Sequence, residues 1–274
     1  MSGAPPSHAF VVLAYGRSPY LESCLASLAA QHVEVPRSVS TSTPYDGLDE
    51  VCARHGATLR VHGPNRGIGH DWNMAYAGAD TDWVTLAHQD DVYEPGYTAF
   101  VRERAAAHPD DRMIWSTYYE IVDGRRRPTV AMLRIKRALL ELGFLGAGRI
   151  TARARKRAVL RLGNPVSCPA VALNRRVLGD FRFRDDMKTN MDWVAWLDIA
   201  EQPGGISLSR RPLVGHRIHP DSETSATIAG GDRYREDLEV FRRLWPDRVA
   251  RSLAAVYTRS YRSNSLDSGP TGVA

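Results

Sequence analysis

The sequence predicts an α/β protein in which a mostly parallel central sheet is flanked by helices. Short apolar runs alternate with segments of helical spacing over roughly the first 90 residues, and glycine or proline separates most of them. Two strands joined through a helix form a right-handed βαβ unit, in which the strands are parallel. A chain of 274 residues is long enough to bury a sizeable core in one large domain.

The first half of the chain supplies the predicted parallel strands. Residues 8–15, HAFVVLAY, form an apolar run typical of a buried strand, and leucines recur at helical spacing over 18–31. Ser18 is expected to cap this helix, with Pro19 at its first position. Further strands are expected at 37–42, 57–63 and 82–89, and further helices at 45–56 and 69–79.

The second half is expected to contain both kinds of element around a basic segment. The glycine, proline and serine content of residues 263–274 predicts a tail without fixed structure. The elements expected before it are helices at 94–108, 189–202 and about 232–262, strands at 112–124, 165–174 and 206–220, and a basic helical segment at 132–161.

Composition limits the class of protein and its compartment. No apolar run reaches the roughly 18–20 residues that span a bilayer, and the N-terminus lacks the basic start and long apolar centre of a signal peptide. Cys24, Cys52 and Cys168 are far apart and odd in number, which indicates a reducing compartment. We therefore expect a cytoplasmic protein.

The net charge of +5 conceals a strongly basic segment. Residues 124–161 contain 12 Lys and Arg residues and one acid, Glu141, so this segment alone carries +11. Within it, one arc of the predicted helix is apolar and the opposite arc carries arginines. Two interpretations remain open, a solvated helical insertion and a contact with the anionic inner surface of the membrane. The apolar arc consists of Leu133, Ile135, Leu139, Leu140, Leu142 and Phe144.

Two adjacent acids follow the strand at 82–89. Asp90 and Asp91 stand at its carboxyl end, which is where ligands bind in sheets of this kind. Two uncompensated carboxylates would repel each other, so a cation or nucleotide site is one interpretation. A solvated turn is the other, because Asp is common in turns.

Five motifs occur in an order that resembles the family 2 glycosyltransferases of the GT-A fold. The resemblance runs from Phe10 to about Thr227 and rests on the combination, because QDD alone is weak. The motifs are VVLAYGRSPYLESCLASLAAQ, NRGIGHDWNMAYAGA, LAHQDDVYEPGY, NMDWVAWLDIA and HRIHPDSET. Together, STSTP, GHDWN, AHQDD, YYEI and GNPVSCPA look most like the O-antigen or capsule sugar transferases.

The resemblance implies a single, Rossmann-like GT-A domain over residues 1–265. Its expected parts are a nucleotide-sugar-binding half at 8–125, a basic helical insertion at 126–163, an acceptor and catalytic half at 164–230, and a C-terminal helix at 231–262.

The resemblance also implies a metal site and a catalytic base. Asp90 occupies the metal-binding position of the DxD motif, and His219 matches the family's late metal-binding histidine, so Mn²⁺ or Mg²⁺ is the expected cofactor. Asp192 matches the general base that takes the proton of the acceptor hydroxyl. From the residues alone, His219 is equally readable as a loop histidine, and Asp192 as a helix N-terminal acid favoured by the macrodipole.

The donor site implied by the resemblance lies over the ends of the first strands. Tyr15 is expected to stack on the nucleobase, although a tyrosine at the edge of the core is the alternative. Gly67 allows a close approach of the backbone. The implied donor-binding residues are Ala14, Tyr15, Arg17, Ser42, Asn65, Gly67, Asn73, Gln89 and Asp91.

Three positions depart from the family pattern. Ser42 lies in the segment where the family usually has a base-contacting aspartate, and His88 replaces the first acid of DxD. Trp72 stands where many members carry an arginine, so the diphosphate must be neutralised by the metal, Arg66 or Arg17. These departures affect the identity of the nucleotide more than the type of reaction.

The expected function is metal-dependent transfer of a hexosyl or deoxyhexosyl group from a nucleoside diphosphate donor, with inversion. The expected acceptor is a glycan on a polyprenyl-linked intermediate of cell-envelope polysaccharide, reached by peripheral contact with the inner face of the plasma membrane. The alternative is a catalytically inactive partner or scaffold that binds nucleotide sugar. The pI of about 9.2 also suggests nucleic acid, but no nucleic-acid-binding motif is present and the Asp pair would repel a phosphate backbone.

Overall fold

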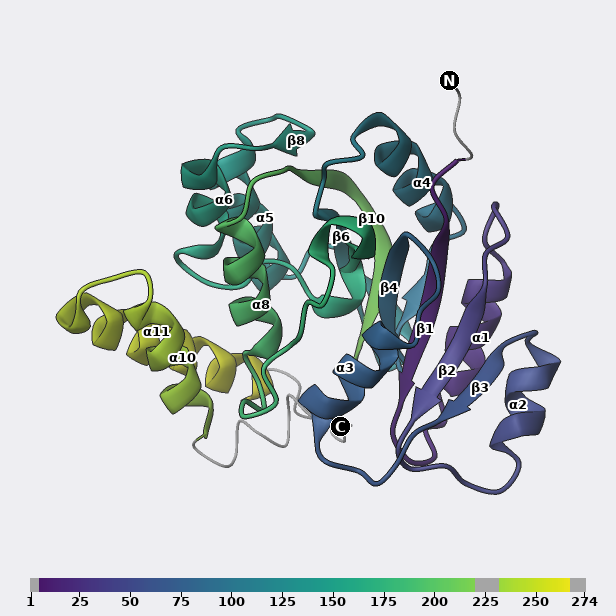
Figure 1. Ribbon diagram of the computed structural model, residues 1–274. Helices are drawn as coiled ribbons and strands as arrows, with labels where there is room; N and C mark the ends of the chain where they lie inside the picture. Colours follow the sequence, from purple (N-terminus) through teal and green to yellow (C-terminus); the bar gives the residue numbers. More distant parts are fainter. Residues whose placement is uncertain (1–4, 220–231, 267–274) are drawn as a thin grey trace.

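The computed structural model describes residues 5–219 and 232–266, with one continuous sheet through the middle of the molecule (Figure 1). The order of the strands is β3-β2-β1-β4-β9-β6-β10-β5, with β7 paired to β6 and β8 to β10. The strands are β1 (His8–Ala14), β2 (Arg37–Thr41), β3 (Thr58–Val61), β4 (Trp83–His88), β5 (Val92–Tyr93), β6 (Met113–Val122), β7 (Arg125–Arg127), β8 (Arg149–Ile150), β9 (Val171–Asn174) and β10 (Ile206–Ile218).

Helices cover the sheet, and further helices lie at one end of it. Figure 1 shows α10 and α11 beside α8, at the end of the molecule opposite to β3 and α2. The helices are α1 (Leu21–Ala29), α2 (Leu48–Arg54), α3 (Ile68–Ala77), α4 (Tyr97–Ala107), α5 (Ala131–Phe144), α6 (Arg153–Leu160), α7 (Arg175–Leu178), α8 (Met191–Ala200), α10 (Asp232–Arg242) and α11 (Asp247–Leu266), with a short 3₁₀ helix at Cys168–Ala170.

The predicted α/β architecture is confirmed. Strands β3, β2, β1 and β4 pair in parallel, and β6 pairs in parallel with β10. The strand β9 runs antiparallel to both β4 and β6, so it joins the two parallel groups without reversing the second one. As a result, β1, β2, β4, β6 and β10 all end at the same edge of the sheet, and this edge carries the candidate site.

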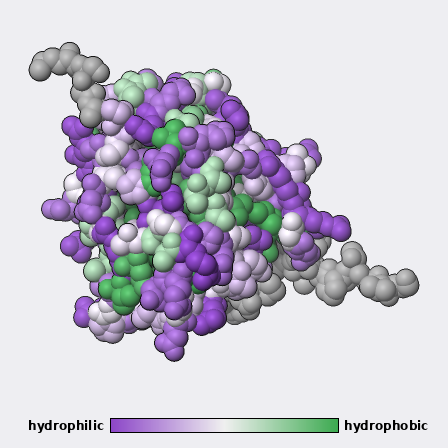
Figure 2. Space-filling model, turned by 90° about the vertical axis from the view of Figure 1, so that its right-hand side faces the viewer, coloured by the Kyte–Doolittle hydropathy of each residue, from purple (hydrophilic) through white to green (hydrophobic). Residues whose placement is uncertain are grey.

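The core is built largely from aromatic side chains on strands and on α8. Trp83, Trp115, Trp193 and Trp196 are all fully buried. Eight of the ten residues of α8 are buried, as expected of a helix that is apolar almost all round. At the opposite end of the sheet, hydrophilic side chains surround scattered hydrophobic clusters on the face shown in Figure 2.

The basic segment folds as two helices, and its apolar arc is divided between core and surface. Leu133, Leu140 and Phe144 of α5 are buried, whereas Ile135 and Leu142 are 54% and 46% exposed. One edge of the arc therefore packs in the core, and the other edge faces outward.

Helices α5 and α6 touch at Gly143. A Cβ atom at this position would collide with the carbonyl oxygen of Arg155 and with the side chain of Val159. The missing side chain is therefore what allows the two helices to pack.

Two local predictions were wrong. Helix α1 begins at Leu21, and the hydroxyl of Ser18 donates a hydrogen bond to Asp90 instead of capping the helix. The expected C-terminal helix is two helices, and α11 continues to Leu266, so residues 263–266 of the expected tail are helical. The rest of that tail, 267–274, lies outside the described residues, as do 220–231, which include the end of the expected acceptor half.

We predict that Gly143→Ala destabilises the protein by about 1–3 kcal/mol, because an overpacked contact forces α5 and α6 apart. Urea unfolding followed by circular dichroism measures the change. Gly96→Ala is the matched control, because a Cβ there meets open space at an ordinary φ of −88°, and we expect a change of no more than about 0.5 kcal/mol. Equal effects of the two substitutions would contradict this account.

Candidate active site

The loops that follow β1, β2 and β4 are joined by hydrogen bonds at the carboxyl edge of the sheet. The backbone N–H of Tyr15 donates to Gln89 Oε1 at 3.2 Å, and Gln89 Nε2 donates to the carbonyl of Tyr15 at 3.1 Å. The N–H of Gly16 donates to Thr43 Oγ1 at 2.7 Å. Ala14 ends β1 beside Thr41 of β2, and the ring of Tyr15 is 59% exposed. The exposed ring of Tyr15 therefore projects from a loop whose backbone is fixed by hydrogen bonds at this edge of the sheet.

Asp71 of helix α3 places its carboxylate next to the end of β2. The Ser42 hydroxyl donates to Asp71 Oδ2 at 2.7 Å, and Asp71 Oδ1 lies 3.8 Å from His62 Nδ1. Burial lowers the pKa of His62, so its imidazole is neutral at pH 7. Asp71 Oδ1 is buried without a hydrogen-bond partner in the described part of the chain. A carboxylate thus lies at the end of β2, although the loop after β2 contains no acid before Asp46.

Asp90 is held between two parts of the chain that are distant in sequence. Ser18 Oγ donates to Asp90 Oδ1 at 2.8 Å, and His219 Nε2 lies 3.3 Å from Asp90 Oδ2. The ring of Tyr20 lies 5.2 Å from that of His219. The structure therefore brings together the two residues predicted as metal ligands.

The carboxylate of Asp91, which was predicted as a donor contact, is buried and hydrogen-bonded to the end of β10. It accepts hydrogen bonds from the N–H of Arg217 at 2.9 Å and from His216 Nδ1 at 3.0 Å, and its side chain is 1% exposed. Burial alone would raise its pKa, but His216 and the Arg217 N–H together hold the pKa of Asp91 below its ordinary value. Burial also opposes the charged imidazole, yet Asp91 raises the pKa of His216. The end of β10 thus neutralises the second acid of the pair.

The candidate base lies in the first turn of α8. Asn164 Nδ2 donates to Asp192 Oδ2 at 2.8 Å, and the N–H of Trp193 donates to Asp192 Oδ1 at 2.7 Å. Burial raises the pKa of Asp192 to about 6, although both hydrogen bonds and the charges of Arg233 and Lys136 oppose the rise. A carboxylate in this state accepts a proton far more readily than an ordinary aspartate.

The charges of Asp192 and of Asp91 both act on one buried thiol. Burial raises the pKa of Cys168, and the charges of Asp192 and Asp91 raise it further, so both carboxylates are within electrostatic range of this sulfur. Lys136 Nζ donates to Tyr118 Oη at 2.5 Å, and the ring of Tyr118 lies 5.7 Å from that of His216. Tyr118 thus links Lys136 of α5 to His216, the partner of Asp91.

Three predicted donor residues have other contacts. The guanidinium of Arg17 lies 4.5 Å over the ring of Tyr45 and donates to the carbonyl of Asp46, so the turn after β2 holds it. The amide of Asn73 donates to the carbonyl of Phe183 and accepts from its N–H. Asn65 Oδ1 accepts from the N–H of Gly67.

The remaining predicted and divergent residues shape the loops. Gly67 precedes α3 with a φ of +98° and open space around it. Trp72 and His88 pack against each other with rings 5.3 Å apart, and burial lowers the pKa of His88. The departures at these two positions therefore form a neutral, packed pair beneath the site.

Sequence reasoning missed several residues of the site. His216 and Arg217 lie within the motif HRIHP, but the period of a strand puts neighbouring side chains on opposite faces, so the pattern did not indicate their contacts with the Asp pair. Asn164 precedes a proline in GNPVS, and Asp71 stands in GHDWN, but neither has a sequence signal that identifies its partner. Lys136 lies in the basic segment, where no local pattern distinguishes it from the surrounding arginines.

The family follows from a comparison with protein-family models. The model described as glycosyl transferase family 2 matches residues 9–179, which is more than half of the chain. The chain belongs to this family. A comparison with curated proteins gave no match.

Solved glycosyltransferases share the fold. TarS 1–349 of S. aureus has a TM-score of 0.63 at 15% identity, over 85% of this chain and 64% of TarS 1–349. The chain thus spans less than two thirds of that structure. The same TarS fragment was also solved with UDP-GlcNAc, and this complex has a TM-score of 0.63 at 14% identity over 92% of this chain and 71% of TarS 1–349. The mannosyltransferase PcManGT from Pyrobaculum calidifontis, solved with GDP-Man and Mn²⁺, has a TM-score of 0.60 at 14% identity over 98% of this chain and 76% of PcManGT.

The residues at Asp90 fit a divalent ion that is shared with a ligand. Within residues 5–219 and 232–266, no group of three or more His, Cys, Asp and Glu side chains could hold a metal by itself. Asp90 and His219 nevertheless offer one carboxylate oxygen and one imidazole nitrogen 3.3 Å apart. An ion bound there needs further oxygen ligands, which a diphosphate supplies.

We predict that Asp91→Asn destabilises the protein by about 3–5 kcal/mol, because removing one partner of a buried pair leaves His216 uncompensated. The lowered pKa of Asp91 implies that the stabilisation is present above the unfolded value of 3.8 and is lost as the pH falls through the folded value. Urea unfolding between pH 3 and 7 tests both points. Asp80→Asn is the control, because the Asp80–Arg60 pair is exposed and should contribute no more than about 1 kcal/mol.

Proposed function

We propose that this protein transfers one hexosyl or deoxyhexosyl group from a nucleoside diphosphate sugar to a hydroxyl of a glycan acceptor, by a single displacement with inversion. The observation that carries the proposal is Asp192, a partly buried carboxylate in the first turn of α8 that has a pKa of about 6 and is held by Asn164 and the N–H of Trp193. One base without a second positioned nucleophile fits direct attack by the acceptor oxygen. An inert scaffold would have no use for a carboxylate poised in this way.

In the proposed reaction, Asp192 accepts the proton of the attacking hydroxyl while the bond to the diphosphate breaks. Asn164 holds Oδ2 of the base in position, and the N–H of Trp193 holds Oδ1. Asp90 and His219 are the residues that would hold Mn²⁺ or Mg²⁺. When bound, such an ion would supply positive charge to the departing diphosphate.

The donor nucleotide is proposed to lie over the ends of β1 and β2. Tyr15 offers an exposed ring for stacking, and Asp71 offers a carboxylate held by Ser42. A carboxylate accepts hydrogen bonds and cannot donate them, so it favours a base with a ring N–H at its pairing edge and is repelled by a ring acceptor nitrogen there. Uracil, thymine and guanine have this group, whereas cytosine and adenine do not. TarS with UDP-GlcNAc and PcManGT with GDP-Man are consistent with this choice.

The acceptor is proposed to be lipid-linked and to belong to the assembly of cell-surface polysaccharide, at the cytoplasmic face of the plasma membrane. None of the helices in the described ranges is long and apolar enough to cross a bilayer. Helix α5 instead presents Ile135, Leu142 and Leu145, which are 54%, 46% and 74% exposed, in a strongly basic segment. Apolar side chains beside cations are what binds a helix to an anionic surface.

We predict that UDP, dTDP or GDP raises the melting temperature in the presence of Mn²⁺, whereas CDP and ADP do not. Differential scanning fluorimetry with and without chelator measures this. Asp90→Ala should abolish the metal-dependent part of the shift, and Asp71→Asn should lower the affinity for the nucleotide by about tenfold, the loss of one charge-assisted hydrogen bond. A preference for CDP, or an unchanged response of Asp90→Ala, would contradict the assignment.

We predict that Asp192→Asn lowers the rate of sugar transfer by about 10²–10⁴-fold, the usual contribution of a general base. The dissociation constant of the donor should differ from that of the wild type by less than twofold. In the wild type, kcat/KM should fall as the pH drops below about 6, because the protonated carboxyl cannot accept a proton.

Asp198→Asn is the matched control for the catalytic base. Asp198 lies on the exposed side of the same helix, so its substitution should leave the rate of transfer unchanged. A wild-type protein that binds the donor but transfers no sugar to any lipid-linked glycan would favour the scaffold interpretation.

A further inference from the structure

Helix α10 is bonded to the residues that lead into α8, the helix of the candidate base, and α11 lies beside it (Figure 1). The carboxylate of Glu236 on α10 is buried and accepts from the N–H groups of Lys188, Thr189 and Asn190, at 2.8, 2.9 and 3.0 Å. Thr189 Oγ1 donates to the same carboxylate at 2.6 Å, and Asn190 Nδ2 donates to Asp237 Oδ1 at 2.8 Å. Two buried carboxylates of α10 therefore fix the start of α8.

Three aromatic rings join the same two helices to Trp193, the residue that follows the base. The rings of Trp193 and Phe241 of α10 lie 5.1 Å apart, and the ring of Tyr257 of α11 lies 5.5 Å from Trp193 and 5.7 Å from Phe241. Trp193 is fully buried, and its N–H donates to Asp192 Oδ1. The ring cluster thus holds the residue whose backbone holds one oxygen of the base.

Tyr257 also contacts the second residue that donates to the base. The N–H of Asn164 donates to Tyr257 Oη at 3.2 Å, and Asn164 Nδ2 donates to Asp192 Oδ2 at 2.8 Å. A Cβ atom at Gly163 would lie 2.8 Å from the ring of Tyr257, so this ring lies directly against the backbone that precedes Asn164. One residue of α11 thus contacts both residues that donate to the base.

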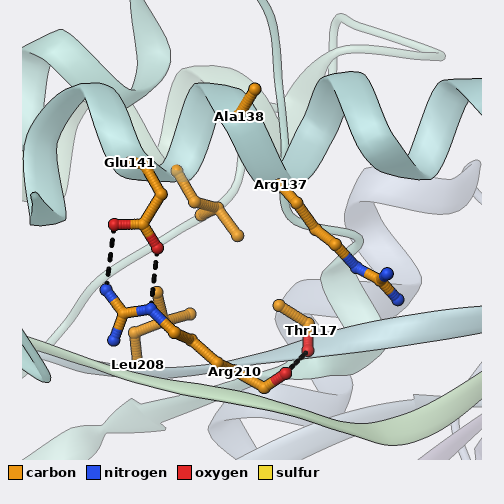
Figure 3. A pocket seen from close by; sticks show the side chains of 7 residues that line it. Thr117, Arg137, Ala138, Glu141, Leu208 and Arg210 are labelled. Carbon is orange, nitrogen blue, oxygen red and sulfur yellow. Dashed lines mark hydrogen bonds and ion pairs between the residues drawn. The ribbon is translucent and has the colours of Figure 1, made fainter. Parts of the chain in front are cut away.

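Helix α5 is held on another side of the site, with a cavity of about 290 Å³ between it and the sheet. At the edge of this cavity, Arg210 donates to both carboxylate oxygens of Glu141, at 2.7 and 3.0 Å, and its carbonyl accepts from Thr117 Oγ1 at 2.9 Å (Figure 3). In the part of the chain that the structure describes, none of the residues that line the cavity donates to Asp192. The hydrogen bonds to the base are therefore supported by α10 and α11 and not by α5.

We propose that α10 and α11 position the catalytic base, and that Tyr257 acts on Asp192 through Asn164. The inference rests on the proposed transferase function and adds a positioning residue to it. A general base must stay within hydrogen-bond reach of the attacking hydroxyl, and a small displacement of such a group lowers the rate. None of the motifs quoted for the family resemblance lies in α10 or α11, so this support comes from a part of the chain that those motifs do not include.

Carbon-13 NMR of the full-length protein, labelled at the side-chain carboxyl of aspartate, measures the pKa of Asp192 and tests this proposal. The loss of one signal in Asp192→Asn identifies the residue. We expect Tyr257→Phe to raise this pKa by about 0.4–1 pH unit, because a weakened hydrogen bond from Asn164 favours the charged carboxylate less. Phenylalanine keeps the ring, and the substitution leaves the charges of Arg233 and Lys136 that act on Asp192 unchanged.

A double-mutant cycle separates positioning through Asn164 from a general structural effect. Asn164→Ala should also raise the pKa of Asp192, and Tyr257→Phe added to it should change the pKa no further, because the side chain on which Tyr257 acts is gone. A second rise of the size seen with Tyr257→Phe alone would overturn the proposal, as would an unchanged pKa in Tyr257→Phe itself.

Thr117→Val is the matched control, because it also removes a hydroxyl that bonds to a backbone group, on the α5 side of the site. The pKa of Asp192 should keep its wild-type value in this variant. A rise equal to that in Tyr257→Phe would overturn the proposal in favour of a general loosening of the site.

The response to nucleotide separates this proposal from the proposed function. With Mn²⁺, Tyr257→Phe should bind UDP, dTDP or GDP with a dissociation constant within about twofold of the wild-type value. Weaker binding would overturn the proposal by making α11 a part of the donor site. Because the pKa is measured without a ligand, a wild type that binds no nucleotide contradicts the transferase and leaves the positioning of Asp192 standing. A wild type that binds nucleotide, with a pKa of Asp192 that Tyr257→Phe leaves unchanged, keeps the transferase without this role for α10 and α11.

Discussion

The candidate site depends on one buried interaction, between Asp91 and the end of β10. The carboxylate receives hydrogen bonds from the imidazole of His216 and from the backbone of Arg217. A buried charge is tolerated only when it is paired and hydrogen-bonded, and these contacts satisfy both conditions. Because Asp91 fixes the strand that carries His219, it also fixes the distance between His219 and Asp90. A residue that touches no ligand thus sets the geometry of the predicted metal site.

The two halves of the protein contribute different chemistry, and β9 brings them together. The strands β1 and β4 end in loops that offer the ring of Tyr15 and the Asp pair, and α3 adds the carboxylate of Asp71. The strands β6 and β10 and the helix α8 bring Tyr118, His216 and Asp192. Because β9 is antiparallel to both of its neighbours, the two groups of strands end at the same edge. A donor and an acceptor bound to this edge can therefore meet.

The insertion shows how one helix can serve both packing and recognition. Leu133, Leu140 and Phe144 of α5 are buried, while Ile135 and Leu142 of the same helix are exposed. Gly143 lets α6 approach closely, which holds α5 against the sheet. A helix held in this way keeps Lys136 in contact with Tyr118 of β6 while Ile135 and Leu142 face outward.

Much of the fold, and the position of the site, could be predicted from the sequence. Apolar runs alternating with amphipathic segments are local patterns, and they predicted the strands up to β4 and the helices between them. The positions of Asp90, His219 and Asp192 followed from motifs that the family preserves in order. The sequence thus determined the family, the edge of the sheet that carries the site, and the residue types available there.

Only the tertiary structure decided which of these side chains meet. Asp91 is separated from His216 by 125 positions in the chain, and Asn164 from Asp192 by 28, so no local pattern could pair them. Ser18 has the sequence of a helix cap, yet α1 begins at Leu21, and the Ser18 hydroxyl accepts from the N–H of Tyr20 and donates to Asp90, a partner 72 positions away. Burial alone raised the pKa of Asp192, and burial is a property of the packed chain.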